Sequence, residues 1–152
     1  MKNLIGFILS LTILISCGRP TGDNKARSKP IVGTWKLLKG TLIEKGDTTV
    51  TDYTNGREFI KIINDTHFAF LSHELNNLSD SAFSAGGGYY SLQDSSYTEH
   101  LVYCSDRQWE GNAFSFVVSI SNDTLIQQGI EKIDSIGVNR INIEKYARVK
   151  GQ

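Results

Sequence analysis

The sequence predicts an all-β fold, a single antiparallel up-and-down β-barrel of about 8–10 strands. Turn-forming residues recur at short intervals, and the segments between them are rich in Ile, Val, Phe, Tyr and Thr. Two Asn-Asp pairs suit the positive φ angles of two-residue hairpin turns. Helix is expected only as short turns in 74–79 and 105–110, the second ended by Gly111.

Nine segments of the chain fit strands of a β-meander. Their expected ranges are 31–44, 48–53, 57–63, 66–73, 86–93, 97–104, 113–121, 124–132 and 140–149. Strands joined by tight turns leave an edge that must be paired, and closure into a barrel removes that edge. The competing architecture is an open sandwich of two sheets.

The hairpin expected around Asn122-Asp123 has a plainly apolar inward face. A two-residue turn there pairs Phe116 with Gly129, Val118 with Gln127 and Ile120 with Leu125. Because successive side chains of a strand point to opposite faces, Ser115, Ser119 and Gln128 fall on the outer side.

A second hairpin, centred on Asp94-Ser95, brings a carboxylate onto an aromatic face. It pairs Leu92 with Tyr97, Tyr90 with Glu99 and Gly88 with Leu101. The same alternation places Tyr103 inward with them. The preceding Gly86–Gly88 segment fits a bulge, a sharp barrel corner, or a place where the wall leaves room for a ligand.

The third hairpin turns at Asn64-Asp65 and is apolar on both faces. We expect its inward face to be the one that carries Phe59, Lys61, Ile63, Phe68 and Phe70.

The N-terminus has the layout of a secretory signal. Lys2 precedes a twelve-residue uncharged stretch, 4–15, which is shorter than the roughly 20 residues that span a bilayer. The following Leu-Ile-Ser-Cys17 resembles a bacterial lipoprotein signal, which implies a signal peptide at 1–16 and lipidation of Cys17. The alternative is an ordinary signal peptide with a chance cysteine.

Residues 17–30 are expected to form a flexible linker, because they include both prolines and no large apolar side chain after Cys17. The folded domain is then 31–152, long enough for one core. It holds eleven of the sixteen Lys and Arg but fifteen of the sixteen Asp and Glu, which argues against a nucleic-acid partner. Cys104 is its single cysteine, so no intramolecular disulfide is available.

The segment Gly33-Thr34-Trp35 resembles the Gly-x-Trp motif on the first strand of lipocalin and calycin barrels. The resemblance implies that Trp35 closes one end of the barrel and that Arg148, from the last strand, packs across its indole. Residues 61–68 and 86–100 are similar to segments of small bacterial lipocalin-like domains of unknown function, often secreted or lipid-anchored. The likeness covers about 31–149 and departs in 74–85 and at Tyr146, where a tryptophan is common.

Glu99 is the most informative candidate site residue, because a carboxylate on an inward face must be paired, hydrogen-bonded or protonated. Tyr90, Lys61 and Arg57 are its candidate partners. Glu99 is either a polar anchor for a ligand or part of a structural network. As ligand-binding residues of the lumen we predict Phe59, Lys61, Phe68, Phe70, Tyr90, Tyr97, Glu99, Phe116 and Val118.

No catalytic motif, cofactor motif or metal-ligand spacing stands out, and the protein is expected to be a non-enzymatic binder of a small apolar or amphipathic molecule. It would be anchored to the bacterial cell envelope, at the outer membrane, and face the periplasm or the exterior. The alternative function is an interaction module with a filled barrel that binds an envelope or extracellular protein through 74–85 and 105–112. In that case Trp109, beside Arg107, would be the exposed anchor.

Overall fold

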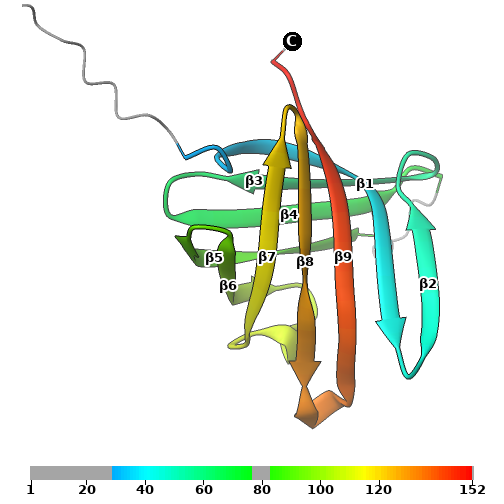
Figure 1. Ribbon diagram of the computed structural model, residues 1–152. Coiled ribbons are helices and arrows are strands. Elements are labelled where there is room, and N and C mark those ends of the chain that lie inside the picture. Colours follow the sequence, from blue (N-terminus) through cyan, green and yellow to red (C-terminus); the bar gives the residue numbers. More distant parts are fainter. Residues whose placement is uncertain (1–28, 77–82, 152) are drawn as a thin grey trace, which may run out of the picture.

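The computed structural model describes residues 29–76 and 83–151, which form one antiparallel sheet of nine strands (Figure 1). The strands are β1 Gly33–Glu44, β2 Asp47–Asp52, β3 Arg57–Ile63, β4 His67–Glu74, β5 Phe83–Gln93, β6 Ser96–Cys104, β7 Ala113–Ser121, β8 Thr124–Ile133 and β9 Val138–Arg148. Two 3-10 turns, η2 Arg107–Trp109 and η3 Asp134–Ile136, complete the elements. All nine predicted strands are confirmed, and the largest difference is the earlier start of β5.

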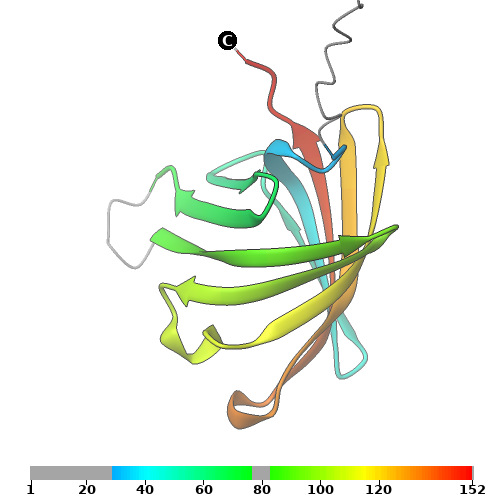
Figure 2. The same ribbon diagram turned by 90° about the vertical axis from the view of Figure 1, so that its left-hand side faces the viewer.

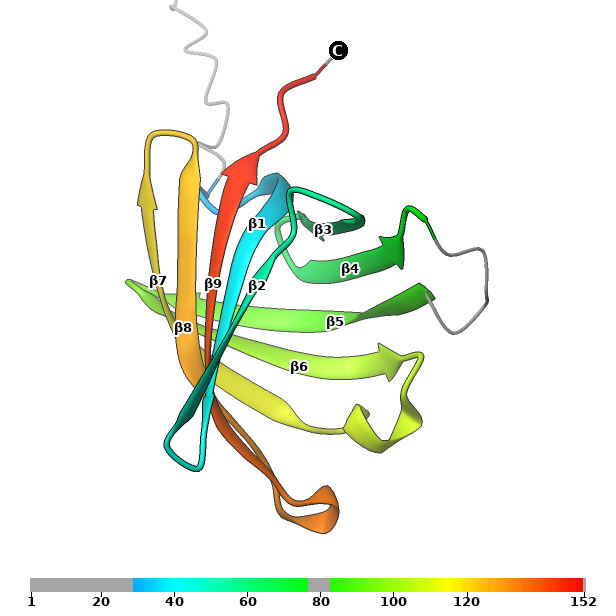
Figure 3. The ribbon, with the colours of Figure 1, turned by 90° about the vertical axis from the view of Figure 1, so that its right-hand side faces the viewer.

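The sheet closes on itself. Its strand order is β2-β1-β3-β4-β5-β6-β7-β8-β9, and β9 pairs back onto β1. Strands β1 and β3–β9 therefore form a closed eight-stranded barrel, which confirms the barrel over the open sandwich. Strand β2 lies outside this ring and pairs with β1 only (Figure 3).

Strand β1 holds the closure together because it has three partners. Its residues 33–36 pair with β3 and its residues 39–44 with β2 on the same side. Along its other side, residues 35–43 pair with β9, with a register shift between Leu37 and Lys39. Such an irregularity bends a strand, and β1 changes partner there.

Two of the predicted hairpin registers are confirmed. Phe116 faces Gly129 across β7 and β8, and Tyr90 faces Glu99 across β5 and β6. The positive φ angles of Asn122 (53°) and Asp94 (54°) explain why these residue types stand at the turns.

The expected two-residue turn at Asn64-Asp65 is wrong, although the predicted inward face of this hairpin is confirmed. Three residues separate β3 from β4, and Ile63 faces Phe68. The Asn64 carboxamide oxygen accepts hydrogen bonds from the backbone nitrogens of Thr66 (2.9 Å) and His67 (2.7 Å). The side chain thus closes the turn without a positive φ angle.

Tyr103 does not point inward as predicted, because the register of β5 and β6 shifts between Gly87 and Gly88. Gly88 faces Leu101 while Gly87 faces Tyr103, so Val102 is an extra residue and the alternation is reset. The Tyr103 side chain is 70% exposed as a result. Strict alternation along β6 would put Cys104 on the face opposite to Glu99, but after the register shift it lines the barrel cavity.

The two ends of the barrel differ, and the end where Arg148 of β9 lies over the indole of Trp35 is called the closed end. The start of the described chain and the C-terminus lie together at the closed end (Figures 1 and 2). Turns β1–β2 and β8–β9 lie at the opposite end (Figure 1). The fully buried Trp35, Leu37 and Tyr146 belong to a core that lies inside the barrel.

The signal peptide predicted at 1–16, Cys17 and most of the linker at 17–30 fall outside the described residues. So does the segment 77–82, with part of the short turn expected in 74–79. Within 29–76 and 83–151, no helix is long and apolar enough to cross a membrane.

Candidate functional site

A cavity of about 350 Å³ lies inside the barrel. Its aromatic wall comes from Phe59, Phe70, Trp109, Phe114 and Phe116. Residues of the β1–β2 hairpin, of the last part of β8 and of the first part of β9 also line the cavity. The cavity therefore lies toward the end of the barrel opposite to the C-terminus (Figure 1). Small-molecule sites in proteins span about 300–1,000 Å³, so the volume suits one small ligand.

The predicted lumen residues separate into two groups. Five of them line this cavity: Phe59, Lys61, Phe70, Glu99 and Phe116. The other four are buried in the core and do not line it: Phe68, Tyr90, Tyr97 and Val118. The Tyr90 hydroxyl donates to the carbonyl oxygen of Asn64 (2.8 Å) rather than to Glu99.

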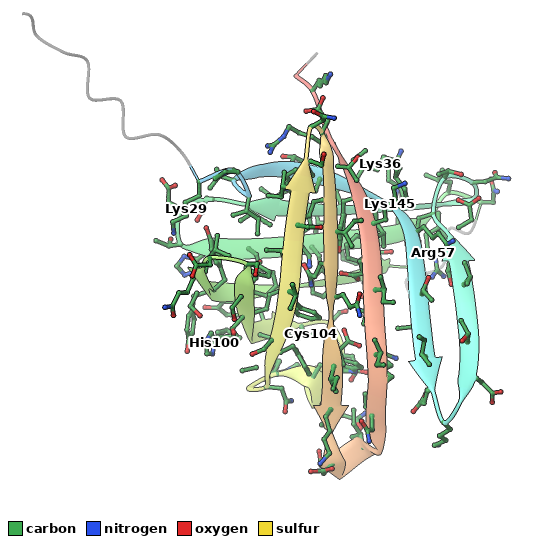
Figure 4. The ribbon with its side chains drawn as sticks, in the orientation of Figure 1. Lys29, Lys36, Arg57, His100, Cys104 and Lys145 are labelled. Atoms are coloured by element: carbon green, nitrogen blue, oxygen red, sulfur yellow. The ribbon has the colours of Figure 1, made fainter. Side chains whose placement is uncertain are left out.

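Lys61 forms the centre of a buried polar network. Its Nζ lies 2.8 Å from Glu99 Oε1, 3.1 Å from Gln127 Oε1 and 3.7 Å from Glu144 Oε2. Strands β3, β6, β8 and β9 contribute these groups, so the network spans the lumen. The other candidate counter-charge for Glu99, Arg57, pairs with Glu74 instead and lies near β2 (Figure 4).

The surroundings of this network shift the ionisation of both partners. Burial alone would lower the pKa of the Lys61 ammonium, but the charges of Glu99 and Glu144 outweigh it and raise this pKa. Burial also raises the pKa of Glu99, although Lys61 opposes the shift and Glu144 adds to it. Lys61 therefore stays charged, while two carboxylates compete for one ammonium.

A second charged cluster lies farther along β8 and β9. Arg140 Nε donates to Glu131 Oε2 (2.7 Å), and Asn142 Nδ2 donates to Glu131 Oε1 (2.8 Å). The Arg140 guanidinium also stacks over Trp109, 5.0 Å from the ring centroid. Both oxygens of Glu131 are thereby occupied.

Two tyrosine hydroxyls border the first network. Tyr146 donates to Glu144 Oε2 (2.6 Å). The Tyr97 hydroxyl is buried and has no hydrogen-bond partner among the described groups. Burial is the largest cause that raises the pKa of Tyr97, and the charges of Glu99 and Glu144 add to the shift.

Trp35 and Arg148 meet at the closed end as the resemblance implied. The Arg148 guanidinium lies 4.1 Å from the centroid of the indole, and Trp35 Nε1 donates to the carbonyl oxygen of Ile31 (2.8 Å). Arg148 Nη1 and Nη2 donate to the carbonyl oxygens of Val32 (2.9 Å) and Pro30 (2.6 Å).

Trp109 is not the exposed anchor that the alternative function required. It is half-buried against the core, 5.8 Å from Phe114 between ring centroids, and its face is covered by Arg140. The neighbouring Arg107 is exposed and pairs with Glu110. The tryptophan thus belongs to the cavity wall.

Sequence reasoning missed four charged lining residues, Asp106, Glu131, Arg140 and Glu144. A signal for two of them was present, because Arg140 and Glu144 share the parity of Arg148 along β9 and Arg148 was expected to point inward. Extending that alternation back along the strand would have found both. Glu131 could have been found in the same way, because it has the same parity along β8 as Gln127, which pairs with the inward Val118.

The described residues include no group of three or more His, Cys, Asp or Glu side chains placed to hold a metal ion. His100 lies on the outside of β6 and stacks on Tyr89, with ring centroids 4.4 Å apart (Figure 4). Cys104 lines the cavity, and burial raises the pKa of its thiol. The thiolate that a nucleophile needs is therefore disfavoured.

Comparisons with protein-family models, with curated proteins and with solved structures gave no match to this chain.

Proposed function

We propose that this protein is a lipocalin-like lipoprotein that binds one small apolar or amphipathic molecule in its barrel, without catalysing a reaction. The observation that carries the proposal is the cavity of about 350 Å³, which joins an aromatic wall to a few fixed polar groups. Binding sites for small molecules combine these two features, because apolar contact supplies affinity and polar groups orient the ligand.

Two features support the calycin relationship. The barrel is closed, and the Gly-x-Trp segment opens β1 while Arg148 on β9 covers the indole of Trp35. Fold does not fix function, so the binding role depends on the cavity rather than on this likeness.

Native mass spectrometry of the full-length protein, extracted gently from its own membranes, tests the binding role. We expect a discrete small molecule to co-purify with the wild-type protein and to be reduced or absent in the Glu99→Gln variant. A Glu58→Gln variant, changed in an exposed ion pair with Lys36 outside the barrel, is the matched control and should keep the molecule. Apo masses in all three proteins, each still folded, would contradict the proposal.

The anchoring role is tested separately. A lipid on Cys17 would make membrane attachment independent of the barrel. We expect a Cys17→Ser variant to leave the membrane fraction of the cell envelope while its circular dichroism stays that of a β-barrel. Unchanged membrane association of this variant would remove the lipid anchor from the proposal.

A further inference from the structure

The charged side chains that line the cavity do not balance. Four are carboxylates, Glu99, Asp106, Glu131 and Glu144, and two are cations, Lys61 and Arg140. Asp106 is exposed to solvent, and among the other five groups three carboxylates face two cations, which leaves a surplus of one negative charge. Charges act more strongly inside a protein than in water, so this surplus biases what can enter.

The lysine in the cavity has little capacity left for an anionic ligand. The Lys61 side chain is only 3% exposed, and its three donors face Glu99, Gln127 and Glu144. An entering carboxylate would have to displace one of two protein carboxylates from this ammonium. Arg140 is engaged with Glu131 and with the face of Trp109.

Acceptors, in contrast, remain available. Glu144 uses only Oε2, which receives the Tyr146 hydroxyl and faces Lys61, and no donor among the described groups bonds to Oε1. A ligand that donates a hydrogen bond would satisfy this oxygen, which the protein leaves without a donor.

The rest of the wall suits a positively charged ligand with an apolar body. Phe59 and Phe70 stack with ring centroids 5.6 Å apart, and both line the cavity with Phe116. Aromatic faces attract cations as well as apolar groups, and the protein already places Lys61 5.4 Å from the Tyr146 ring centroid.

We infer that the cavity is selective for organic cations, in which a primary or secondary ammonium group is attached to a small aromatic or aliphatic body. The ammonium contacts Glu144 and Glu99, and the body packs on Phe59, Phe70 and Phe116. This inference rests on the proposed function, since it names the class of ligand that the same cavity takes.

Three water-soluble probes of similar body and different charge test the inference: phenethylamine, phenylethanol and phenylpropionate. Each is titrated into the full-length protein in nonionic detergent by isothermal calorimetry, with a detergent blank, at neutral pH. We expect phenethylamine to bind at least about tenfold more tightly than phenylpropionate, because like charges brought together in a binding site are strongly unfavourable. Phenylethanol should lie between them.

Two variants locate the origin of this selectivity. Glu144→Gln should weaken phenethylamine about tenfold and leave phenylethanol unchanged, so the neutral probe also reports that the barrel remains folded. Glu58→Gln removes the same charge outside the barrel and should change neither probe. Equal weakening in both variants would assign the effect to net charge and overturn the inference.

The outcomes separate the inference from the proposed function. If phenylethanol or phenylpropionate binds as tightly as phenethylamine, the selectivity for cations is wrong and the binding function stands. If none of the three probes binds to the folded protein, the selectivity is overturned, and the binding function then depends on whether a small molecule co-purifies in the mass-spectrometry experiment.

Discussion

Lys61 decides the charge balance inside the barrel. Its ammonium is buried on β3 and is shared by Glu99 and Glu144, which come from two other strands. Removing charges from water is costly, and their attraction compensates only when each is well paired. The same residue type on the outer face of the barrel would carry no such consequence.

Replacing Lys61 by Met keeps most of the side-chain volume but leaves Glu99 without its counter-charge. We expect the free energy of unfolding at neutral pH to fall by about 3–5 kcal/mol, as for other buried pairs that lose one partner. Urea unfolding followed by tryptophan fluorescence measures the loss. Lys36→Met, in a half-exposed pair with Glu58, is the control and should lose at most about 1 kcal/mol. Equal losses would contradict the assigned role.

Glu99 should make the free energy of unfolding depend on pH in a way that surface carboxylates do not produce. Burial raises its pKa above the ordinary 4.5, with Glu144 adding and Lys61 opposing. The folded state then holds this proton more tightly than the unfolded state. The resulting stability is fully present below pH 4.5 and is lost as the pH rises through the raised pKa. Lys61, whose pKa is raised above 10.5, does not titrate in this range.

The measurement is the free energy of unfolding of wild type and Glu99→Gln between pH 4 and 8. Relative to the variant, the wild type should lose stability as the pH rises. Asp52, Glu58 and Asp123 have lowered pKa values and act in the opposite direction, but they are common to both proteins and cancel in the difference. A flat difference would mean that the pKa of Glu99 is the same in the folded and unfolded states, and a difference that grows in favour of the wild type would mean that folding lowers it; either result contradicts the prediction.

At the scale of elements, the bulge in the β5–β6 hairpin determines which side chains reach the cavity. The register shift at Gly87 and Gly88 turns Tyr103 out to solvent and Cys104 inward. A β-carbon on Gly88 would overlap the carbonyl oxygen of His100. The same β-carbon would lie 2.9 Å from the backbone nitrogen of Val102. Both neighbours are backbone atoms of the bulge, so they cannot move aside independently.

Gly88→Ala should therefore be strongly destabilising. We expect a loss of about 3 kcal/mol or more in the free energy of unfolding, at or beyond the upper end of the usual cost of overpacking. Gly40→Ala is the matched control within a strand, because its β-carbon would meet only the half-buried Tyr53 ring, 3.1 Å away at Cε2, and a side-chain ring can shift where backbone atoms cannot. Thermal and urea unfolding compare the two, and a mild effect at Gly88 would mean that the bulge can relax.

Local rules predicted two of the three hairpin registers, but they left the bulge as one of several alternatives for Gly86–Gly88. A two-residue turn fixes the pairing on both of its sides, so the register around Asn122-Asp123 followed from the turn alone. A bulge adds a residue to one strand, and three successive glycines fit a bulge, a corner or a ligand space equally well. The error at Tyr103 arose at this point.

The candidate site was predictable in its parts but not in its contacts. Lys61 and Glu99 followed from alternation along their own strands. That they pair with each other did not, because β4 and β5 lie between β3 and β6 in the sheet. The two side chains meet across the lumen, at a distance set by the tilt and shear of the closed barrel rather than by any neighbouring register.

For the whole molecule, the two ends of the barrel have different physical roles. The closed end joins the last strand to the segment before the first one, where Arg148 binds the carbonyl oxygens of Pro30 and Val32 and stacks on Trp35. The opposite end holds the cavity. A chain tethered through its N-terminus would be attached next to the closed end, which leaves the cavity end free.

Arg148→Lys tests how much the closed end contributes to the stability of the whole barrel. Lysine keeps the charge but cannot reach two carbonyl oxygens with a planar fork, nor stack flat on the indole. We expect the free energy of unfolding to fall by about 2–3 kcal/mol, the sum of a lost charged hydrogen bond and a weakened cation–π contact. Arg107→Lys, at an exposed arginine paired with Glu110, should change the free energy of unfolding by less than about 0.5 kcal/mol.

In the Arg148→Lys variant, hydrogen exchange should also become faster at the amide of Val32, which donates to the carbonyl oxygen of Lys29 in the wild type. If Arg148→Lys unfolds like the wild type and that amide stays protected, Trp35 and the β1–β9 pairing close the barrel without the arginine.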